Sequence, residues 1–236
     1  MTMTKPLQRC TCGRHGFLQA LGFKGNGFFG FGASRVVAAP GADELRLPDT
    51  AACKAAEAYL GALSSSAMVG HCKRTFLFGR ALADKAGARP DLEALYVGSL
   101  FHDLGLEPIF EGPDDFEVIG AREASRFLKA KGYPVLADTV AAAIEIHTSR
   151  ATAEDPRPEV AYLNMGATVD VLGLRIDQID RKLIQQIVEE YPRDGTKTML
   201  TALLKREIDT KPNSNFSQIA ARVDVLKLIN DAPFAH

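Results

Sequence analysis

The stretch LEALYVGSLFHDLG, residues 92–105, combines a helical pattern with two polar residues that such a helix rarely carries. Its apolar residues recur at helical spacing, which predicts that one face lies in the core: Leu92, Leu95, Tyr96, Leu100 and Leu104. Asp91 is typical of a helix start and Gly105 of a helix end, so His102 and Asp103 are expected in the last turn. A carboxylate among apolar neighbours is costly unless its charge is compensated, and a bound metal ion would do this while also using the imidazole. An isolated His-Asp pair is more often a hydrogen-bonded histidine beside an exposed aspartate, so the rest of the chain must decide.

The composition predicts an ordinary globular protein. The chain has 236 residues, 46% of them hydrophobic and 24% charged, with a net charge of -1, which suits one well-packed domain. Lysine and arginine form no basic stripe, so we expect no nucleic-acid and no membrane partner, and a homo-oligomer stays an open possibility. The four cysteines lack zinc-ribbon spacing and are expected to be free thiols: Cys10, Cys12, Cys53 and Cys72.

Residues 1–47 differ from the rest of the chain. They begin basic, turn apolar with many glycines and phenylalanines, and reach small residues at 38–42, which is the order of a secretory signal. Arg14-His15 resembles a twin-arginine motif whose second arginine is a histidine. Two interpretations stay open, a degenerate signal for export to a bacterial periplasm and a flexible leader on a cytoplasmic protein. The domain proper is expected at 48–236.

From residue 48 onward the sequence predicts helix after helix, with almost no strand alternation. The expected helices cover 50–60, 68–85, 92–104, 115–131, 134–147, 158–172, 176–191, 196–207 and 216–229. We find no internal repeat and no linker between large parts. The fold class is therefore predicted to be all-α, in one domain after an irregular leader.

Four of these helices carry candidate ligands: His71, the pair His102-Asp103, His147 and Asp170. Taken singly, His71 and His147 are more often hydrogen-bonded core residues. Asp170 stands between apolar residues and is harder to explain that way, because buried carboxylates need partners.

The order His, then His-Asp, then Asp resembles the HD superfamily of metal-dependent hydrolases, whose fold is a helical bundle. The resemblance implies one divalent metal ion bound by His71, His102, Asp103 and Asp170. Two imidazoles and two carboxylates suit Fe, Zn or Mn without selecting sharply among them. Four protein ligands would leave room for water and substrate, and the ion would lower the pKa of that water.

The chain looks closest to the cyanamide hydratase branch of this superfamily. Six blocks occur in the family's order: His71-Cys-Lys-Arg74-Thr-Phe76, Leu95-Tyr-Val97 before the doublet, Phe116-Glu117-Val-Ile-Gly120, Ala143-Ile-Glu-Ile-His147, Asp170-Val-Leu-Gly173, and Tyr191-Pro-Arg193 followed by Thr210-Lys-Pro212. The residues just after the doublet, 104–108, differ from the hydratases. The resemblance implies a metal-dependent hydrolase or hydro-lyase that adds water to a small nitrile- or amide-like substrate.

Five further residues are candidates for the chemistry. Arg74 lies one turn from His71 and is expected to anchor a site carboxylate, unless it is simply solvated. Glu117 is expected to orient water or accept a substrate N–H, although a first-turn carboxylate also suits the helix dipole. Phe116 is expected to wall the pocket and Thr148 to assist. His147 is expected to act as a base, a substrate donor or a ligand of a second ion.

The main alternative is a metal-dependent phosphohydrolase acting on a nucleotide or another phosphoester. Such a substrate needs cations, and the candidates are Lys73, Arg74, Arg122 and Arg150. No lysine closely follows the doublet, which favours a neutral substrate. A non-catalytic module that has lost its ligands is disfavoured, because all four ligand positions are intact.

Overall fold

The computed structural model describes residues 44–153 and 155–234, and these contain helices and no strand. The α-helices are α2 (Ala51–Leu63), α3 (Ser66–Ala86), α4 (Leu92–Phe101), α5 (Phe116–Ala130), α6 (Pro134–Glu145), α7 (Pro158–Leu172), α8 (Arg181–Glu190), α9 (Thr196–Thr210), α10 (Asn215–Ala220) and α11 (Val225–Asn230). Four short 3-10 turns join them: η1 (Leu104–Leu106), η2 (Pro108–Phe110), η3 (Arg150–Ala153) and η4 (Ile176–Gln178). The all-α prediction is confirmed.

Some predictions fall on residues outside this description. They are the leader up to residue 43 and the thiols Cys10 and Cys12. Cys53 and Cys72 are buried free thiols, as expected. No helix among the described residues is both long and apolar enough to cross a membrane.

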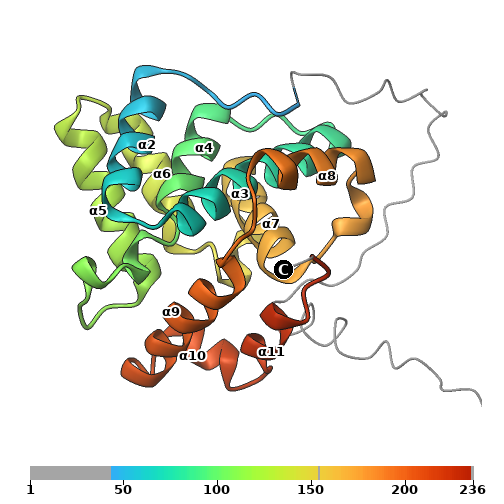
Figure 1. Ribbon diagram of the computed structural model, residues 1–236. Helices are drawn as coiled ribbons and strands as arrows, with labels where there is room; N and C mark the ends of the chain where they lie inside the picture. The colour runs from blue at the N-terminus through green and yellow to red at the C-terminus, as the bar shows by residue number, and fades with distance from the viewer. Residues whose placement is uncertain (1–43, 154, 235–236) are drawn as a thin grey trace, which may run out of the picture.

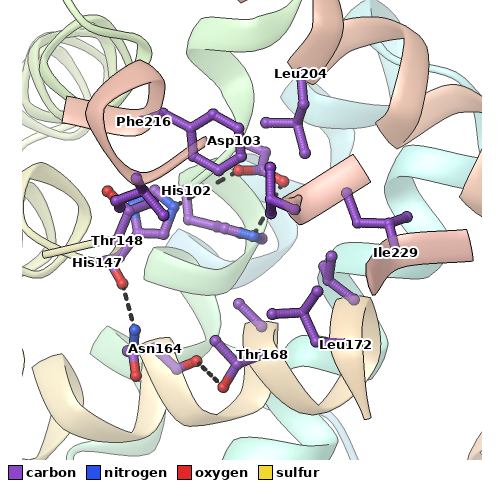
Figure 2. Close-up of a pocket in the computed structure, with 14 residues that line it drawn as sticks. His102, Asp103, His147, Thr148, Asn164, Thr168, Leu172, Leu204, Phe216 and Ile229 are labelled. Carbon is purple, nitrogen blue, oxygen red and sulfur yellow. Dashed lines mark hydrogen bonds and ion pairs between the residues drawn. The ribbon is translucent and has the colours of Figure 1, made fainter. Parts of the chain in front are cut away.

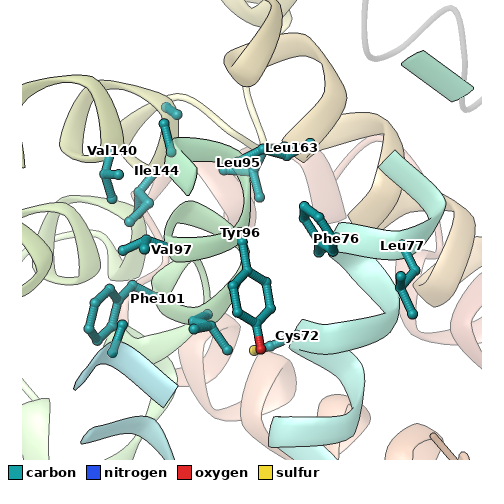
Figure 3. Packing of buried hydrophobic residues seen from close by; sticks show 14 of the residues in the cluster. Cys72, Phe76, Leu77, Leu95, Tyr96, Val97, Phe101, Val140, Ile144 and Leu163 are labelled. Atoms are coloured by element: carbon teal, nitrogen blue, oxygen red, sulfur yellow. The ribbon is translucent and has the colours of Figure 1, made fainter. Parts of the chain in front are cut away.

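Helix α4 is the central element of the bundle (Figure 1). It packs against α2, α3, α6 and α7. Its side chains meet those of α3, α6 and α7 in one apolar cluster (Figure 3). Four of the five predicted core residues are buried, but Leu92 is 40% exposed because it starts the helix at the edge of the bundle. The end of α4 that precedes His102 and Asp103 is thus packed among other helices.

Two glycine contacts bring the elements of the site close together. A Cβ atom on Gly166 of α7 would lie 2.0 Å from the backbone oxygen of Thr75 in α3. A Cβ atom on Gly105 would lie 2.0 Å from the backbone oxygen of Phe116 at the start of α5. Since only glycine permits such approaches, α3 can lie against α7, and the chain after α4 can lie against α5.

Several predicted helices end or divide differently in the structure, among them 134–147, which ends at Glu145 and leaves His147 beyond the helix. Helix α4 ends at Phe101, so His102 and Asp103 lie just beyond the helix rather than in its last turn. The predicted helix 176–191 is η4 followed by α8, because Asp180 caps α8 by accepting two backbone N–H bonds. The predicted helix 216–229 is two helices, because Asp224 caps α11 by accepting a hydrogen bond from the backbone N–H of Lys227.

The last three α-helices gather at one end of the molecule (Figure 1). With residues of η1, α5 and α7 they build a second apolar cluster, beside the main core. Its buried members are Leu106, Phe116, Leu172, Leu174, Leu200, Leu204, Phe216, Val225 and Ile229. This cluster covers the end of α4, where His102 and Asp103 lie.

Candidate metal centre

Three ligand atoms meet at the end of α4. His71 Nε2 lies 3.1 Å from His102 Nε2. Asp103 Oδ2 lies 3.3 Å from each of these two nitrogens. Two ligands that are each about 2.1 Å from an ion, at angles between 90° and 110°, are roughly 3.0–3.4 Å apart. The spacing of the three buried groups therefore fits one metal ion.

The protonation of the two imidazoles also fits an ion. His102 Nδ1 donates to the backbone oxygen of Ser99 at 2.8 Å, and His71 Nδ1 donates to Asp170 Oδ2 at 2.7 Å. In the neutral form of each ring Nδ1 carries the proton, so each Nε2 presents a lone pair and, with the carboxylate, faces one point. A cation at that point satisfies all three. Burial lowers the pKa of His71, but Asp103 and Asp170 outweigh it and raise that pKa, so a proton competes with an ion for this nitrogen.

Asp170 lies on the other side of His71. Besides His71, its carboxylate accepts hydrogen bonds from Arg74 Nε at 2.8 Å, from Arg74 Nη2 at 3.1 Å and from Arg193 Nη1. The three side chains and that of His71 are buried. The compact group of ligand atoms comprises His71, His102 and Asp103, without Asp170. The structure thus brings Asp170 to the histidine rather than to the point where the other ligand atoms meet.

Arg74 is a buried anchor. Its remaining N–H groups donate to the backbone oxygens of Tyr191 and Pro192 and to the hydroxyl of Thr196. The alternative of a solvated arginine is wrong, because the side chain is fully buried. The carboxylate that Arg74 binds is that of Asp170.

Burial and neighbouring charges determine the ionisation of this centre. Burial raises the pKa of Asp103, but His102, His147 and His71 outweigh it and hold that pKa well below its usual range. Burial likewise raises the pKa of Asp170, but Arg74, His71 and Arg193 together lower it. Burial lowers the pKa of His102, which favours the neutral ring. An ionised Asp103 beside the neutral imidazole of His102 is suited to a divalent cation.

His147 follows α6 and lies beside Asp103 and His102. Its Nε2 lies 3.7 Å from Asp103 Oδ1, and its ring meets the ring of His102 edge-on, with centroids 5.1 Å apart. Nδ1 donates to the backbone oxygen of Ile144 at 2.7 Å, so the lone pair of a neutral ring is on Nε2. Burial lowers the pKa of His147, but Asp103 and Glu117 outweigh it and raise that pKa. The side chain is therefore placed to take up a proton beside Asp103.

Glu117 lies behind His147 in a small polar network. Glu117 Oε1 accepts hydrogen bonds from the Thr148 hydroxyl and from Asn215 Nδ2, while Oε2 is buried with no hydrogen-bond partner among the described residues. Asn215 Nδ2 also donates to the Thr148 hydroxyl at 2.7 Å. Burial raises the pKa of Glu117 above its usual value. Phe116 packs edge-on against the ring of His147, with centroids 5.6 Å apart.

A cavity of about 80 Å³ opens beside the centre (Figure 2). His102, Asp103 and His147 form its polar end. The rest of its lining is Thr148, Asn164, Ala167, Thr168, Val171, Leu172, Leu204, Phe216, Ile219, Val225 and Ile229. Among the residues whose side chains the structure describes, no lysine or arginine lines this cavity. Lys73 pairs with Glu57 and Arg122 with Asp114 instead.

The predicted site residues fall into two groups. His102, Asp103, His147 and Thr148 line the cavity. The other five lie behind these and do not line it: Arg74, His71, Phe116, Glu117 and Asp170.

The sequence did not predict several residues that contribute to the metal centre and its cavity. Arg193 lies within the block at 191–193 but received no role, and Asn215 carried no signal. The apolar wall from α9 to α11 has the pattern of ordinary core positions.

Comparison with known proteins adds one finding. A family model described as HD domain matches residues 68–228, from the start of α3 almost to the end of α11. The matched range contains all nine predicted site residues. No curated protein matches the chain.

Proposed function

Because the chain belongs to the HD domain family of metal-dependent hydrolases, we propose that it adds water to a small, neutral, nitrile- or amide-like substrate. The ion would be held by His71, His102 and Asp103, and the donor set is suited to Fe, Zn or Mn. The cavity beside these residues is the observation that carries the proposal.

The cavity favours a neutral substrate over a phosphoester. Binding a phosphate group calls for cationic side chains, and no described lysine or arginine lines the wall. A charged group against carbon atoms is costly. At about 10–15 Å³ for one water molecule, this volume holds only a few heavy atoms, whereas a nucleotide has many more. A small molecule such as cyanamide suits it better.

Hydrogen bonds on the side away from the ion would hold the two histidine ligands in place. Ser99 and Asp170 accept from the Nδ1 atoms of His102 and His71, which keeps both Nε2 atoms available. Arg74 and Arg193 hold Asp170 in turn. Such outer partners orient histidine ligands and raise their basicity. A bound divalent ion supplies Lewis acidity, lowering the pKa of water and polarising the substrate.

His147 would accept the proton released from water. Its Nε2 lone pair faces the polar end of the cavity, and Asp103 lies near enough to stabilise the imidazolium. The same nitrogen can return the proton to the substrate nitrogen. The oxygen of water ends double-bonded to the substrate carbon, and its two hydrogens end on the former nitrile nitrogen, so cyanamide becomes urea.

The test is urea formation from cyanamide by the full-length protein, loaded with iron or zinc. A His102→Ala variant is the control, since it removes a ligand. Urea made by the wild type and not by the variant would support the proposal. Phosphate release from phosphoesters by the same preparation, without urea formation, would replace the proposal by the phosphohydrolase alternative.

A second variant assigns the role of His147. We expect His147→Ala to abolish turnover, because it removes the proton acceptor, while the metal content stays at the wild-type level. Metal content by elemental analysis, measured beside turnover, separates the two roles. Loss of the ion in this variant would make His147 a ligand instead.

A further inference from the structure

The cavity has two chemically different ends. All the polar groups that meet the metal centre lie at one end, in His102, Asp103 and His147. The opposite wall consists of carbon and comes from α7 and from the three C-terminal helices: Val171, Leu172, Leu204, Phe216, Ile219, Val225 and Ile229. Figure 2 shows Leu204, Phe216, Ile229 and Leu172 arranged around the space in front of Asp103.

Most polar atoms of the other lining side chains already have partners. The Thr168 hydroxyl donates to the backbone oxygens of Asn164 and Met165. Asn164 Nδ2 donates to the backbone oxygen of His147 at 2.6 Å, and the Thr148 hydroxyl donates to Glu117. Asn164 Oδ1 is buried with no hydrogen-bond partner among the described residues. Apart from Asn164, a ligand meets hydrogen-bonding groups mainly at the metal end.

This wall is a firm part of the structure. Leu172, Leu204, Phe216, Val225 and Ile229 are all buried members of the second apolar cluster. Phe216 also packs edge-on against Phe116, with centroids 6.0 Å apart. A bare polar molecule such as cyanamide would leave these carbon atoms without an apolar partner. A substrate with a hydrocarbon part would bury that part against them.

We infer that the substrate is a short-chain alkyl nitrile, with its C≡N group at the metal end and its aliphatic chain against the wall of α9–α11. This inference rests on the proposed function. The cavity of about 80 Å³ limits the chain. At about 10–15 Å³ for one water-sized group it holds roughly five to eight groups, and the nitrile carbon, the nitrogen and the water take three of these, which leaves about two to five carbons for the chain. Water adds across one π bond of the nitrile, with its oxygen on carbon and one hydrogen on nitrogen, which gives the imidic acid. The remaining O–H proton then moves to nitrogen while the second C–N π bond is replaced by the C=O π bond of the amide.

The first measurement is a chain-length series. The metal-loaded full-length protein is assayed with acetonitrile, propionitrile, butyronitrile, valeronitrile and hexanenitrile, beside cyanamide. We expect kcat/KM to rise by about fourfold for each added methylene, as expected for burial of a CH₂ group, and to fall once the chain exceeds the cavity. Equal kcat/KM values along the series would overturn the inference.

Variants at Ile229 test the position of the chain. Ile229→Phe fills the apolar end and is expected to lower the butyronitrile-to-cyanamide ratio of kcat/KM at least tenfold. Ile229→Ala enlarges the same end and should move the optimum to a longer chain, so the test survives if the larger residue prevents folding. Leu228→Phe is the matched control, because Leu228 lies on the same helix but does not line the cavity. It should leave the ratio as in the wild type.

Binding separates this inference from the proposed function. Butyronitrile and its shorter homologues are followed by ligand-observed NMR on the same samples. Binding that strengthens with chain length and is lost in Ile229→Phe, without turnover, would keep the aliphatic pocket and remove the hydratase function. Turnover of cyanamide with no effect of chain length or of Ile229 would keep the function and overturn the pocket. Absence of both binding and turnover would overturn both.

Discussion

Asp170 lies beside the candidate metal centre and not within its compact group of three ligand atoms. The HD resemblance assigns Asp170 as a ligand. Its carboxylate lies against His71 Nδ1 and two guanidinium groups, so it is engaged on the side away from His102 and Asp103. We expect Asp170 to position His71, with Arg74 and Arg193 holding it in place.

Replacing Asp170 by asparagine tests this role without any metal. The change leaves two buried guanidinium groups without an anionic partner, which typically costs about 3–5 kcal/mol of unfolding free energy. We expect such a loss in metal-free protein, measured by urea unfolding. Asp103→Asn is the comparison and should cost less, because Asp103 faces only imidazoles. Equal stability of the two metal-free variants would favour a ligand role for Asp170.

Glu117 gives a pH dependence with a defined sign. Burial raises the pKa of its carboxyl in the folded protein above 4.5, its ordinary value. Below pH 4.5 the Glu117 carboxyl is protonated in both the folded and the unfolded protein, so its ionisation does not change the free energy of unfolding. As the pH rises above 4.5 the unfolded chain ionises first, so ionisation of Glu117 destabilises the folded protein in that window.

Glu117→Gln should therefore gain stability over the wild type as the pH rises. We expect the difference in melting temperature, variant minus wild type, to grow between pH 4 and pH 8. Glu111→Gln, at an exposed glutamate, is the control and should show no such trend. A difference that shrinks with pH would contradict the assigned direction of the shift.

At the scale of the elements, the site depends on how closely α3 and α7 cross. Gly79 faces the backbone of Tyr162, and Gly166 faces that of Thr75. The crossing places His71 of α3 beside Asp170 of α7. The end of α4 lies next to the same crossing and adds His102 and Asp103.

Gly166→Ala should separate the two helices. Its new Cβ would lie 2.0 Å from a backbone oxygen, which cannot move aside as a side chain can. We expect a loss of about 1–3 kcal/mol or more, as for other overpacked positions, measured by denaturant unfolding. Gly61→Ala in α2 is the control, since nothing lies within 4 Å of its Cβ. Helix propensity predicts that this change stabilises by up to about 1 kcal/mol.

At the scale of the whole molecule, the candidate ion links four segments of the bundle. Its ligands would come from α3 and from the end of α4, while His147 after α6 lies beside Asp103 and Asp170 in α7 lies beside His71. Arg193 continues this chain of contacts to the C-terminal residues, because its guanidinium stacks on the ring of Phe234 at 4.0 Å. Binding of an ion is therefore expected to stabilise the folded bundle as a unit.

Metal addition should raise the melting temperature of the wild type. An ion at 100 times its Kd stabilises a folded protein by about 2.7 kcal/mol. We expect the increase with zinc or iron, its reversal by a chelator, and its absence in His71→Ala. Calorimetric melting scans of the full chain provide the measurement. The same increase in His71→Ala would place the ion elsewhere.

The sequence alone determined the fold class and most of the donors. Helical periodicity is local, so the starts at Pro134 and Pro158 and the all-α class followed from neighbouring residues. His71, His102 and Asp103 stood out because polar groups are costly in apolar helices, and these three meet in the structure. The helix breaks before Asp180 and Asp224 were missed, because apolar periodicity continues across both caps.

Only the tertiary structure decided how the donors are arranged and what faces them. Asp170 turned to the far nitrogen of His71 because Arg193, 23 residues away in the chain, reaches the same carboxylate. The cavity wall of α9–α11 has the sequence pattern of core, since an apolar residue beside a cavity looks the same as one in a filled interior. Contacts between distant segments determine which of the two it is, and no local pattern records them.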